Sequence, residues 1–359
     1  MMTARIKGLL ISGVLMTWVL MLFGVCVGSA GFDPLWKSFL SGAADPSASD
    51  MMQQIIWDIR LPRTLGAWAA GALLGLAGAL AQGLFRNPLA DPYLLGSGSG
   101  ACLGVALALA LLSGGSSLLG GAGMMNAVLP IGVFSSNIWV RVGLTGSAFM
   151  GAVVAVLLTM VLAKGLGNTL RLLLSGVIVG VVLGALTHLV TLGSPESLQA
   201  MQTFMLGSTA FVGWNSALLM LLIWLACWFV SWLLARVLDG LSLGDSTAFT
   251  LGLPVATLRM ALVAVLALAT GTAVAQTGLI AFVGLASPHL IRSLVKTTHQ
   301  HLMILASLAG GVLLLCADIL ARGLMAPQEL PVGVLTAVIG GGYLLWLMYR
   351  DSPQQAGVR

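Results

Sequence analysis

The sequence contains few charged residues. Asp, Glu, Lys and Arg together make up 8% of its 359 residues, whereas they make up about 25% of an average soluble domain. Such a low fraction excludes a soluble globular domain, and the hydrophobic fraction of 58% predicts a protein that lies in a lipid bilayer. The net charge of +5 comes from basic residues that are spread one or two to a loop. We therefore expect contact with membrane lipid and no nucleic-acid partner.

Cysteine and the common catalytic motifs are also scarce. The four cysteines stand singly in apolar segments, without the CxxC or Cys-His spacing of a metal site, so we expect packing residues, no disulfide framework and no metal. The sequence has no GxxxxGK[ST] phosphate loop, no HExxH and no GxSxG. We therefore expect no ATP hydrolysis by this chain alone, no enzymatic activity and no cofactor. The cysteines are Cys26, Cys102, Cys227 and Cys316.

Long uncharged segments, in contrast, are abundant. A helix of about 20 residues rises about 1.5 Å per residue and crosses about 30 Å of hydrocarbon. Segments of about this length predict an all-α, polytopic membrane protein. Residues 273–288 are long enough to contain one more short helix, which brings the expected number of transmembrane helices to about ten. The segments are residues 8–28, 65–84, 93–113, 143–163, 172–192, 211–235, 260–282, 303–317 and 331–349.

Residues 65–84 form the most informative of these segments. Gly66, Gly71, Gly75 and Gly78 recur here among alanines, so that small residues fall at three- and four-residue spacings. Small residues at these spacings lie on helix faces where another backbone can approach closely. We therefore expect this helix to pack against other helices.

The basic residues predict the orientation of the chain. If the N-terminus is inside, most of the 16 basic residues fall in inner loops, and an even number of helices returns the C-terminus to the same side. We therefore expect a multi-pass protein with cytoplasmic N- and C-termini. The alternative for residues 8–28 is a signal peptide, whose removal would weaken this charge bias. Arg60, Arg63 and Arg322 fall outside and need another explanation.

The predicted organisation is a single transmembrane domain over residues 1–359. Residues 31–57 form an outer loop, and residues 351–359 form a cytoplasmic tail. Residues 237–258 form an inner element of two short helices, broken by glycines and a proline. Such an element has no role in spanning the bilayer, so it predicts contact with a cytoplasmic partner. Residues 194–208 predict a short helix at the outer surface, with Ser194 as its cap.

Several motifs carry a resemblance over residues 55–350, in unbroken order. They are RLPRTLGAWAAGALLGLAGALAQGLFRNPLADPYLLG, LLLSGVIVG, LGDSTAFTLGLP, AFVGLASPHLIR, and ADILAR followed by ELPVGVLTAVIG. Together they resemble the permease subunits, of FecCD/BtuC type, of binding-protein-dependent ABC importers for iron chelates, haem and vitamin B12. The resemblance implies a ten-helix type II importer fold in the bacterial inner membrane. It also implies a homodimer that works with two ATP-binding cassette subunits, which would bind ATP and Mg, and with a periplasmic substrate-binding protein.

By resemblance, the outer arginines Arg60, Arg63 and Arg322 match positions that receive acidic residues of the docked binding protein. Arginine suits this role because its guanidinium forms bidentate hydrogen bonds with carboxylates. The alternative is that these arginines are helix-end anchors whose side chains reach the membrane surface.

Also by resemblance, the inner element contains the coupling helices that sit in a cleft of the ATPase. Glycines in it permit tight turns, and Asp245 and Ala248 are expected on the exposed first helix. The alternative is a plain amphipathic connector. The predicted coupling residues are Leu243, Gly244, Asp245, Ala248, Gly252, Leu253 and Pro254.

The pathway for the substrate is harder to predict. Methionines and aromatic residues would supply an adaptable lining, although methionines often serve simple packing, and a single histidine is often structural. The predicted pathway residues are Tyr93, His188, Met201, Phe204 and Met205.

The resemblance favours an iron complex, haem or a ferric siderophore, as substrate, with vitamin B12 as the alternative. An ion-coupled secondary transporter is the alternative of another class. The chain departs from the family pattern in its last helix, where Gly340–Gly342 replaces a GAP sequence and its proline kink.

Overall fold

A computed structural model describes residues 4–28, 31–32, 51–118, 138–163, 169–193, 195–250 and 254–351. Parts of the sequence predictions lie outside these residues. They are residues 33–50 of the outer loop, the cap Ser194, the coupling residues Gly252 and Leu253, and residues 352–359 of the tail.

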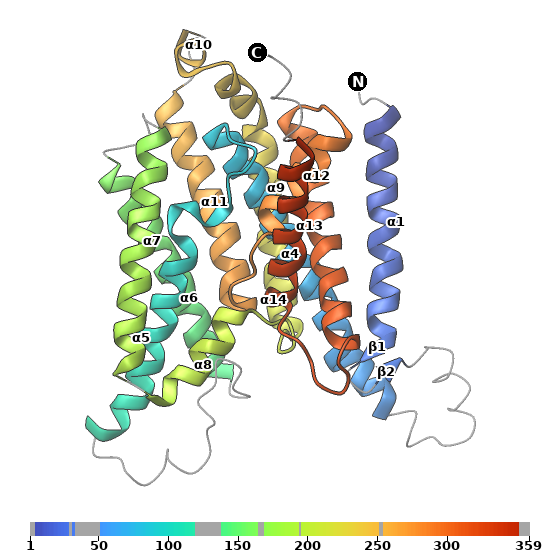
Figure 1. The fold of residues 1–359 in the computed structure, drawn as a ribbon, viewed down its shortest axis with the longest axis vertical. Coiled ribbons are helices and arrows are strands. Elements are labelled where there is room, and N and C mark those ends of the chain that lie inside the picture. Colours follow the sequence, from blue (N-terminus) through green and yellow to red (C-terminus); the bar gives the residue numbers. More distant parts are fainter. Residues whose placement is uncertain are drawn as a thin grey trace.

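The described chain is a bundle of helices (Figure 1). The long helices are α1 (Ala4–Cys26), α4 (Leu61–Phe85), α5 (Ser97–Leu118), α6 (Ile138–Leu162), α7 (Thr169–Leu192), α9 (Trp214–Ser242), α11 (Val255–Thr277), α13 (His299–Gly323) and α14 (Val332–Asp351). The short ones are α8 (Pro195–Leu206), α10 (Asp245–Thr250), α12 (Val283–Leu294), the π-helix η1 (Ile55–Arg60) and the 3-10 helix η2 (Pro92–Leu95). Strands β1 (Val27–Gly28) and β2 (Gly31–Phe32) form an antiparallel pair in which Val27 lies opposite Phe32.

The predicted fold class is confirmed. Within the described ranges, seven helices are long and apolar enough to cross a membrane, and α5 and α14 contain two shorter apolar stretches. The short helix expected near residues 273–288 is α12, which begins ten residues further on than predicted, at Val283. The predicted surface helix is α8. With α12 counted, the helices agree roughly with the expectation of ten.

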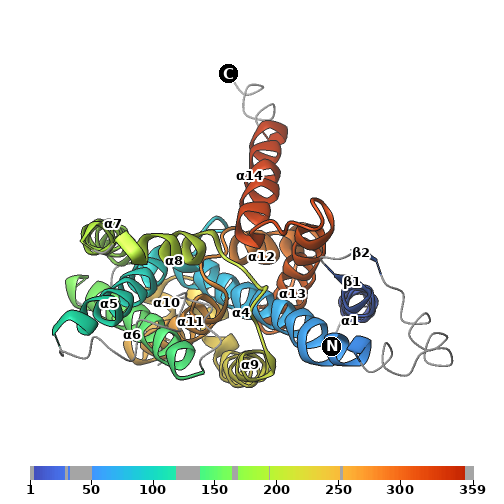
Figure 2. The same ribbon diagram turned by 90° about the horizontal axis from the view of Figure 1, so that it is seen from below.

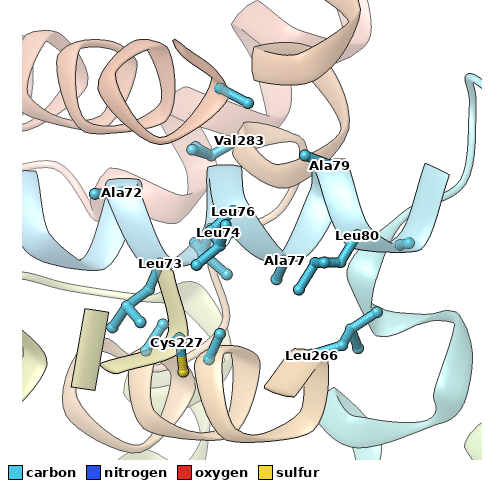
Figure 3. Packing of buried hydrophobic residues seen from close by; sticks show 14 of the residues in the cluster. Ala72, Leu73, Leu74, Leu76, Ala77, Ala79, Leu80, Cys227, Leu266 and Val283 are labelled. Carbon is cyan, nitrogen blue, oxygen red and sulfur yellow. The ribbon is translucent and has the colours of Figure 1, made fainter. Parts of the chain in front are cut away.

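Helix α4 lies at the centre of the bundle (Figure 2), and 94% of its apolar span is buried. Its glycines allow the close packing that the sequence predicted. A methyl group on Gly71 would overlap the backbone carbonyl of Gly310 in α13, and one on Gly75 would overlap that of Ala306. The leucines of α4 face the other neighbouring helices (Figure 3), where Cys227 of α9 is buried as an unpaired thiol.

Several predicted boundaries are wrong. Residues 51–57 are helical rather than part of a loop, because Ile55, Ile56 and Trp57 continue directly into α4 through η1. Helix α5 continues to Leu118 instead of ending at residue 113. Helix α9 continues to Ser242, because Leu238 and Leu241 are buried and hold its last turns against the bundle. The described part of the inner element therefore contains one short helix, α10, instead of two.

The two ends of the bundle differ. Figure 1 places α10, the start of α1 and the end of α14 at one end, and β1, β2 and α8 at the other. We refer to these as the α10 end and the hairpin end. Helix α14 projects from the bundle (Figure 2), and much of it is exposed, including Val338, Leu345 and Tyr349. It continues as one helix through Gly340–Gly342.

Candidate functional site

A cluster of charged side chains lies at the hairpin end, around Asp318 of α13. Its carboxylate is completely buried and accepts hydrogen bonds at Oδ1 from Arg63 Nε (3.2 Å) and Arg63 Nη2 (3.1 Å). Thr209 Oγ1 donates to the same oxygen at 2.5 Å. The other oxygen, Oδ2, pairs with Arg322, four residues further along α13. A buried charge is tolerated only when it is paired and hydrogen-bonded, and this carboxylate meets both conditions.

The guanidinium of Arg322 also connects α13 to the end of α1. Its Nη1 donates to the backbone carbonyls of Gly24 (2.9 Å) and Val27 (3.2 Å), and its Nη2 lies 3.3 Å from Thr64 Oγ1 of α4. These bonds use carbonyls at the C-terminal end of α1, which have no partner inside their own helix. Arg322 therefore holds α1, α4 and α13 together at this end.

Arg60 and Arg63 extend the cluster on the other sides. Arg60 Nη1 donates to the carbonyls of Val25 (3.3 Å) and Cys26 (3.4 Å). Arg63 Nη1 donates at 2.9 Å to Glu329, in the connection between α13 and α14. The side chain of Glu329 is 26% exposed, so it forms the outer edge of the cluster.

The structure thus brings the three predicted docking arginines together at one end of the bundle, but all three are buried. Their guanidinium groups contact Asp318, Glu329 or backbone carbonyls of this same chain. Their docking role stays a prediction. Sequence reasoning missed both acidic partners, although an aspartate four residues before an arginine in an apolar segment is a signal for an i,i+4 pair.

The predicted coupling element lies at the α10 end. Helix α10 follows α9 after a turn at Gly244, whose φ of +113° is one that glycine adopts readily. Leu243 in this turn is 67% exposed, and Pro254, also exposed, directly precedes α11. Ala248 was expected on an exposed face of the helix, but it is completely buried, and its backbone N–H donates to Gly244. Helix α10 begins at Asp245.

Between α4 and η2, the chain carries a half-buried carboxyl group. Asp91 caps η2, and its Oδ1 accepts a hydrogen bond from the backbone N–H of Tyr93 at 2.8 Å. Burial raises the pKa of Asp91 from its ordinary 3.8 to about 6. Nearby, Arg86 ends α4 in a left-handed conformation, and desolvation, followed by the charge of Arg259, lowers its pKa.

The structure brings three of the five predicted pathway residues together. Met201 and Phe204 of α8 are buried in a core cluster that includes residues of α5, α6 and α11, and Tyr93 packs against this cluster. The phenol of Tyr93 donates to the carbonyl of Ile280 at 3.2 Å. Met205 and His188 are exposed. Burial gives Met201 and Phe204 a packing role within the chain.

These features define a class of protein: a multi-pass α-helical membrane protein, whose described residues include seven helices long and apolar enough to cross a membrane. Comparison with known proteins then identifies the family. The model of the FecCD transport family matches residues 16–350, and the chain belongs to this family.

Curated relatives agree with this assignment. The chain is 37% identical over 360 residues to the hemin transport system permease protein HmuU of Yersinia pestis, covering 99% of this chain and 100% of that protein. It is also 37% identical over 308 residues to the vitamin B12 import system permease protein BtuC of Pectobacterium atrosepticum, covering 84% of each. The chain is therefore a permease subunit of the ABC importer type, and such subunits are not themselves enzymes.

Solved structures share the fold. One, described as an inward-facing conformation of an ABC transporter assigned to the metal-chelate type, has a TM-score of 0.77 and 27% sequence identity, and the match covers 96% of this chain and 99% of that one. A second, PsaBC from Streptococcus pneumoniae in complex with Fab, has a TM-score of 0.55 and 16% identity, and the match covers 87% of this chain and 94% of that one. The second likeness concerns the fold alone.

Proposed function

We propose that the chain is the membrane-spanning subunit of an ATP-driven importer that moves an iron complex, haem or a ferric siderophore, into the cytoplasm. The observation that carries this proposal is the full-length match to a hemin transport permease. Vitamin B12 is the alternative substrate, because the identity to a vitamin B12 permease is equally high over a shorter stretch.

We also propose a homodimer. Helices α7, α8, α12 and α14 lie along one side of the bundle (Figure 2). Large apolar side chains are exposed on these helices, such as Leu189 of α7 and Leu345 of α14. Helix α14 has few neighbours within its own chain, so a second copy on this side would give it the partner that it lacks.

The partners follow from the two ends of the bundle. We place two ATP-binding cassette subunits, which bind ATP and Mg, at the α10 end, and a periplasmic substrate-binding protein at the hairpin end. The chain itself then needs no cofactor. Support comes from the position of α10 on the same side as the start of α1 and the end of α14, which agrees with the charge-based orientation (Figure 1). The chain would lie in the bacterial inner membrane with cytoplasmic termini.

For docking of the binding protein, Arg63 is the best placed of the three arginines. Its Nη1 points to the partly exposed Glu329, whereas Arg322 is completely buried. We propose that Arg60 and Arg322 shape the outer surface and that Arg63 lies at its accessible edge. Of the pathway residues, the exposed His188 and Met205 are the ones that a substrate or a second copy could contact.

Reconstitution tests the proposed function. The chain is purified with its ATPase and binding protein, placed in vesicles, and supplied in turn with haem, a ferric siderophore or cobalamin. We expect ATP-dependent uptake of an iron complex. Uptake of cobalamin alone would select the alternative substrate. Uptake driven by an ion gradient, with the permease alone, would instead show a secondary transporter and refute the proposal.

A further inference from the structure

The last turn of α9 is joined to the first residue of α13 by a pair of side-chain contacts. Asp239 Oδ1 accepts a hydrogen bond from the backbone N–H of His299 at 3.1 Å. The same oxygen lies 2.6 Å from His299 Nδ1. A carboxylate oxygen is an acceptor only, so a contact of this length places a proton on Nδ1, and the ring donates. Asp239 therefore holds both the start of α13 and the orientation of its first side chain.

The other side of the His299 ring faces α4. A methyl group on Gly83, in the last turn of α4, would lie 3.1 Å from His299 Nε2 and 3.2 Å from its Cδ2. The ring thus occupies the space that the glycine leaves, and its side chain is only 14% exposed. At His299, three helices meet: α4, α9 and α13.

Asp239 is connected to α10 by short hydrogen-bonded turns. Ser242 Oγ donates to the carbonyl of Asp239 at 2.6 Å, and the backbone N–H of Gly244 donates to Leu241 at 3.2 Å. Ala248 within α10 donates in turn to Gly244 at 3.0 Å. A displacement of α10 therefore reaches Asp239 without a flexible linker in between.

On the membrane side, His299 leads into a rigid pair of helices. Helices α4 and α13 approach backbone to backbone at Gly71 and Gly310. At the hairpin end, Arg63 and Asp318 join the same two helices again. The α4–α13 pair is thus closed at both ends, and close-packed pairs of this kind move as a unit.

We propose that Asp239 and His299 are positioning residues that attach the α10 segment, Leu243 to Thr250, to the α4–α13 pair. A movement of α10 that the ATPase imposes would then be passed to the membrane-spanning helices. This inference rests on the proposed function, in which the ATPase binds at α10. Without the Asp239–His299 contact, α10 would move independently of α13, and ATP would be hydrolysed with little transport.

The test measures uptake and ATP hydrolysis on the same vesicles, with the complete complex. We expect Asp239→Ala and His299→Ala to lower the number of substrate molecules taken up per ATP by roughly 5-fold or more, the lower end of typical coupling between sites. Asp239→Asn should stay close to the wild type, because its amide oxygen still accepts both hydrogen bonds. His301→Ala is the matched control, because His301, in the first turn of α13, contacts Thr298 just before the helix and makes no contact with Asp239 that would join α9.

A second variant perturbs the contact without removing either partner. Gly83→Ala pushes against the ring of His299, and we expect the same loss of uptake per ATP. Gly143→Ala is its control, since a methyl group there meets nothing within 4 Å.

The outcomes separate the inference from the proposed function. A wild-type ratio of uptake to ATP hydrolysis in His299→Ala and Gly83→Ala would overturn the inference. Loss of the ATPase subunit from the purified variant complexes would also overturn it, because the contact would then be needed for assembly. Failure of the wild-type complex to couple ATP to uptake would instead overturn the proposed function itself.

Discussion

Arg63 and Asp318 lie 255 residues apart in the sequence, yet two nitrogen atoms of the arginine donate to the same carboxylate oxygen. Asp318 pairs with Arg322 as well, so one carboxylate contacts two buried guanidinium groups. A surface ion pair contributes little to stability, but the loss of one partner of a buried pair leaves an unpaired charge in an apolar environment.

Replacement of Asp318 should therefore be costly. We expect Asp318→Asn to lower the free energy of unfolding by about 3–5 kcal/mol, because Arg322 loses its paired carboxylate and Arg63 keeps only the partly exposed Glu329. Thermal unfolding of the purified chain in detergent measures this change. Glu329→Gln is the control: it removes only the partly exposed contact with Arg63 and should cost about 1 kcal/mol or less. Equal shifts in the two variants would contradict a special role for Asp318.

Charge reversal at Arg60 tests docking of the binding protein. We expect Arg60→Glu to abolish the stimulation of ATP hydrolysis by the binding protein, because a carboxylate would repel the carbonyls of Val25 and Cys26 and so distort the outer surface that Arg60 shapes. Arg60→Lys keeps the charge and should retain part of the stimulation. The measurement is ATP hydrolysis by the reconstituted complex with and without binding protein, and full stimulation in Arg60→Glu would show that Arg60 does not shape the docking surface.

Helix packing can be tested at Gly71. We expect Gly71→Ala to destabilise the chain by about 1–3 kcal/mol, because the new methyl group overlaps the carbonyl of Gly310, which cannot move aside like a side chain. Gly143→Ala adds the same group in open space and should not destabilise. Unfolding midpoints in detergent compare the two, and a stable Gly71→Ala variant would show that α4 and α13 can separate.

The pKa of Asp91 predicts a pH dependence of stability. Because this pKa rises from 3.8 to about 6 on folding, the folded chain binds the proton more tightly than the unfolded chain. The contribution to stability is complete below about pH 4 and is lost as the pH rises through about 6, with a limit of about 3 kcal/mol. Asp91→Asn still caps η2 and should lack this dependence. The measurement is the unfolding midpoint of the wild type and of Asp91→Asn at several pH values between 4 and 8. If Asp91 were solvated, the two midpoints would change with pH in the same way.

The exposure of the α10 segment predicts which positions reach the ATPase. We expect Leu243→Cys to form cross-links to the ATPase subunit, because Leu243 is 67% exposed. Ala248→Cys, at a completely buried position of the same segment, should form none. Gel analysis of the complex after treatment with a short bifunctional thiol reagent measures both. Equal labelling of the two would place the ATPase elsewhere.

The sequence predicted features that depend on local composition. Apolar length predicted the helices, and the glycines of α4 predicted the close approach that Gly71 and Gly310 make. Pairing over long distances was not predictable. Arg63 at a helix end suggests an exposed cation, because neither hydropathy nor spacing reveals that Asp318 lies beside it. The predicted end of α9 at residue 235 was wrong for the same reason, because the contact of Asp239 with His299 and the burial of Leu238 keep the helix intact to Ser242.

The central position of α4 has a consequence for how the chain is made. It is the least apolar of the seven long spans and the most buried, so lipid alone is a poor environment for it. Its most extensive neighbour is α13, which the ribosome adds more than two hundred residues later. The middle of the molecule can therefore be completed only when synthesis is almost finished, because the face of α4 that carries Gly71 and Gly75 has no neighbour until α13 has been made.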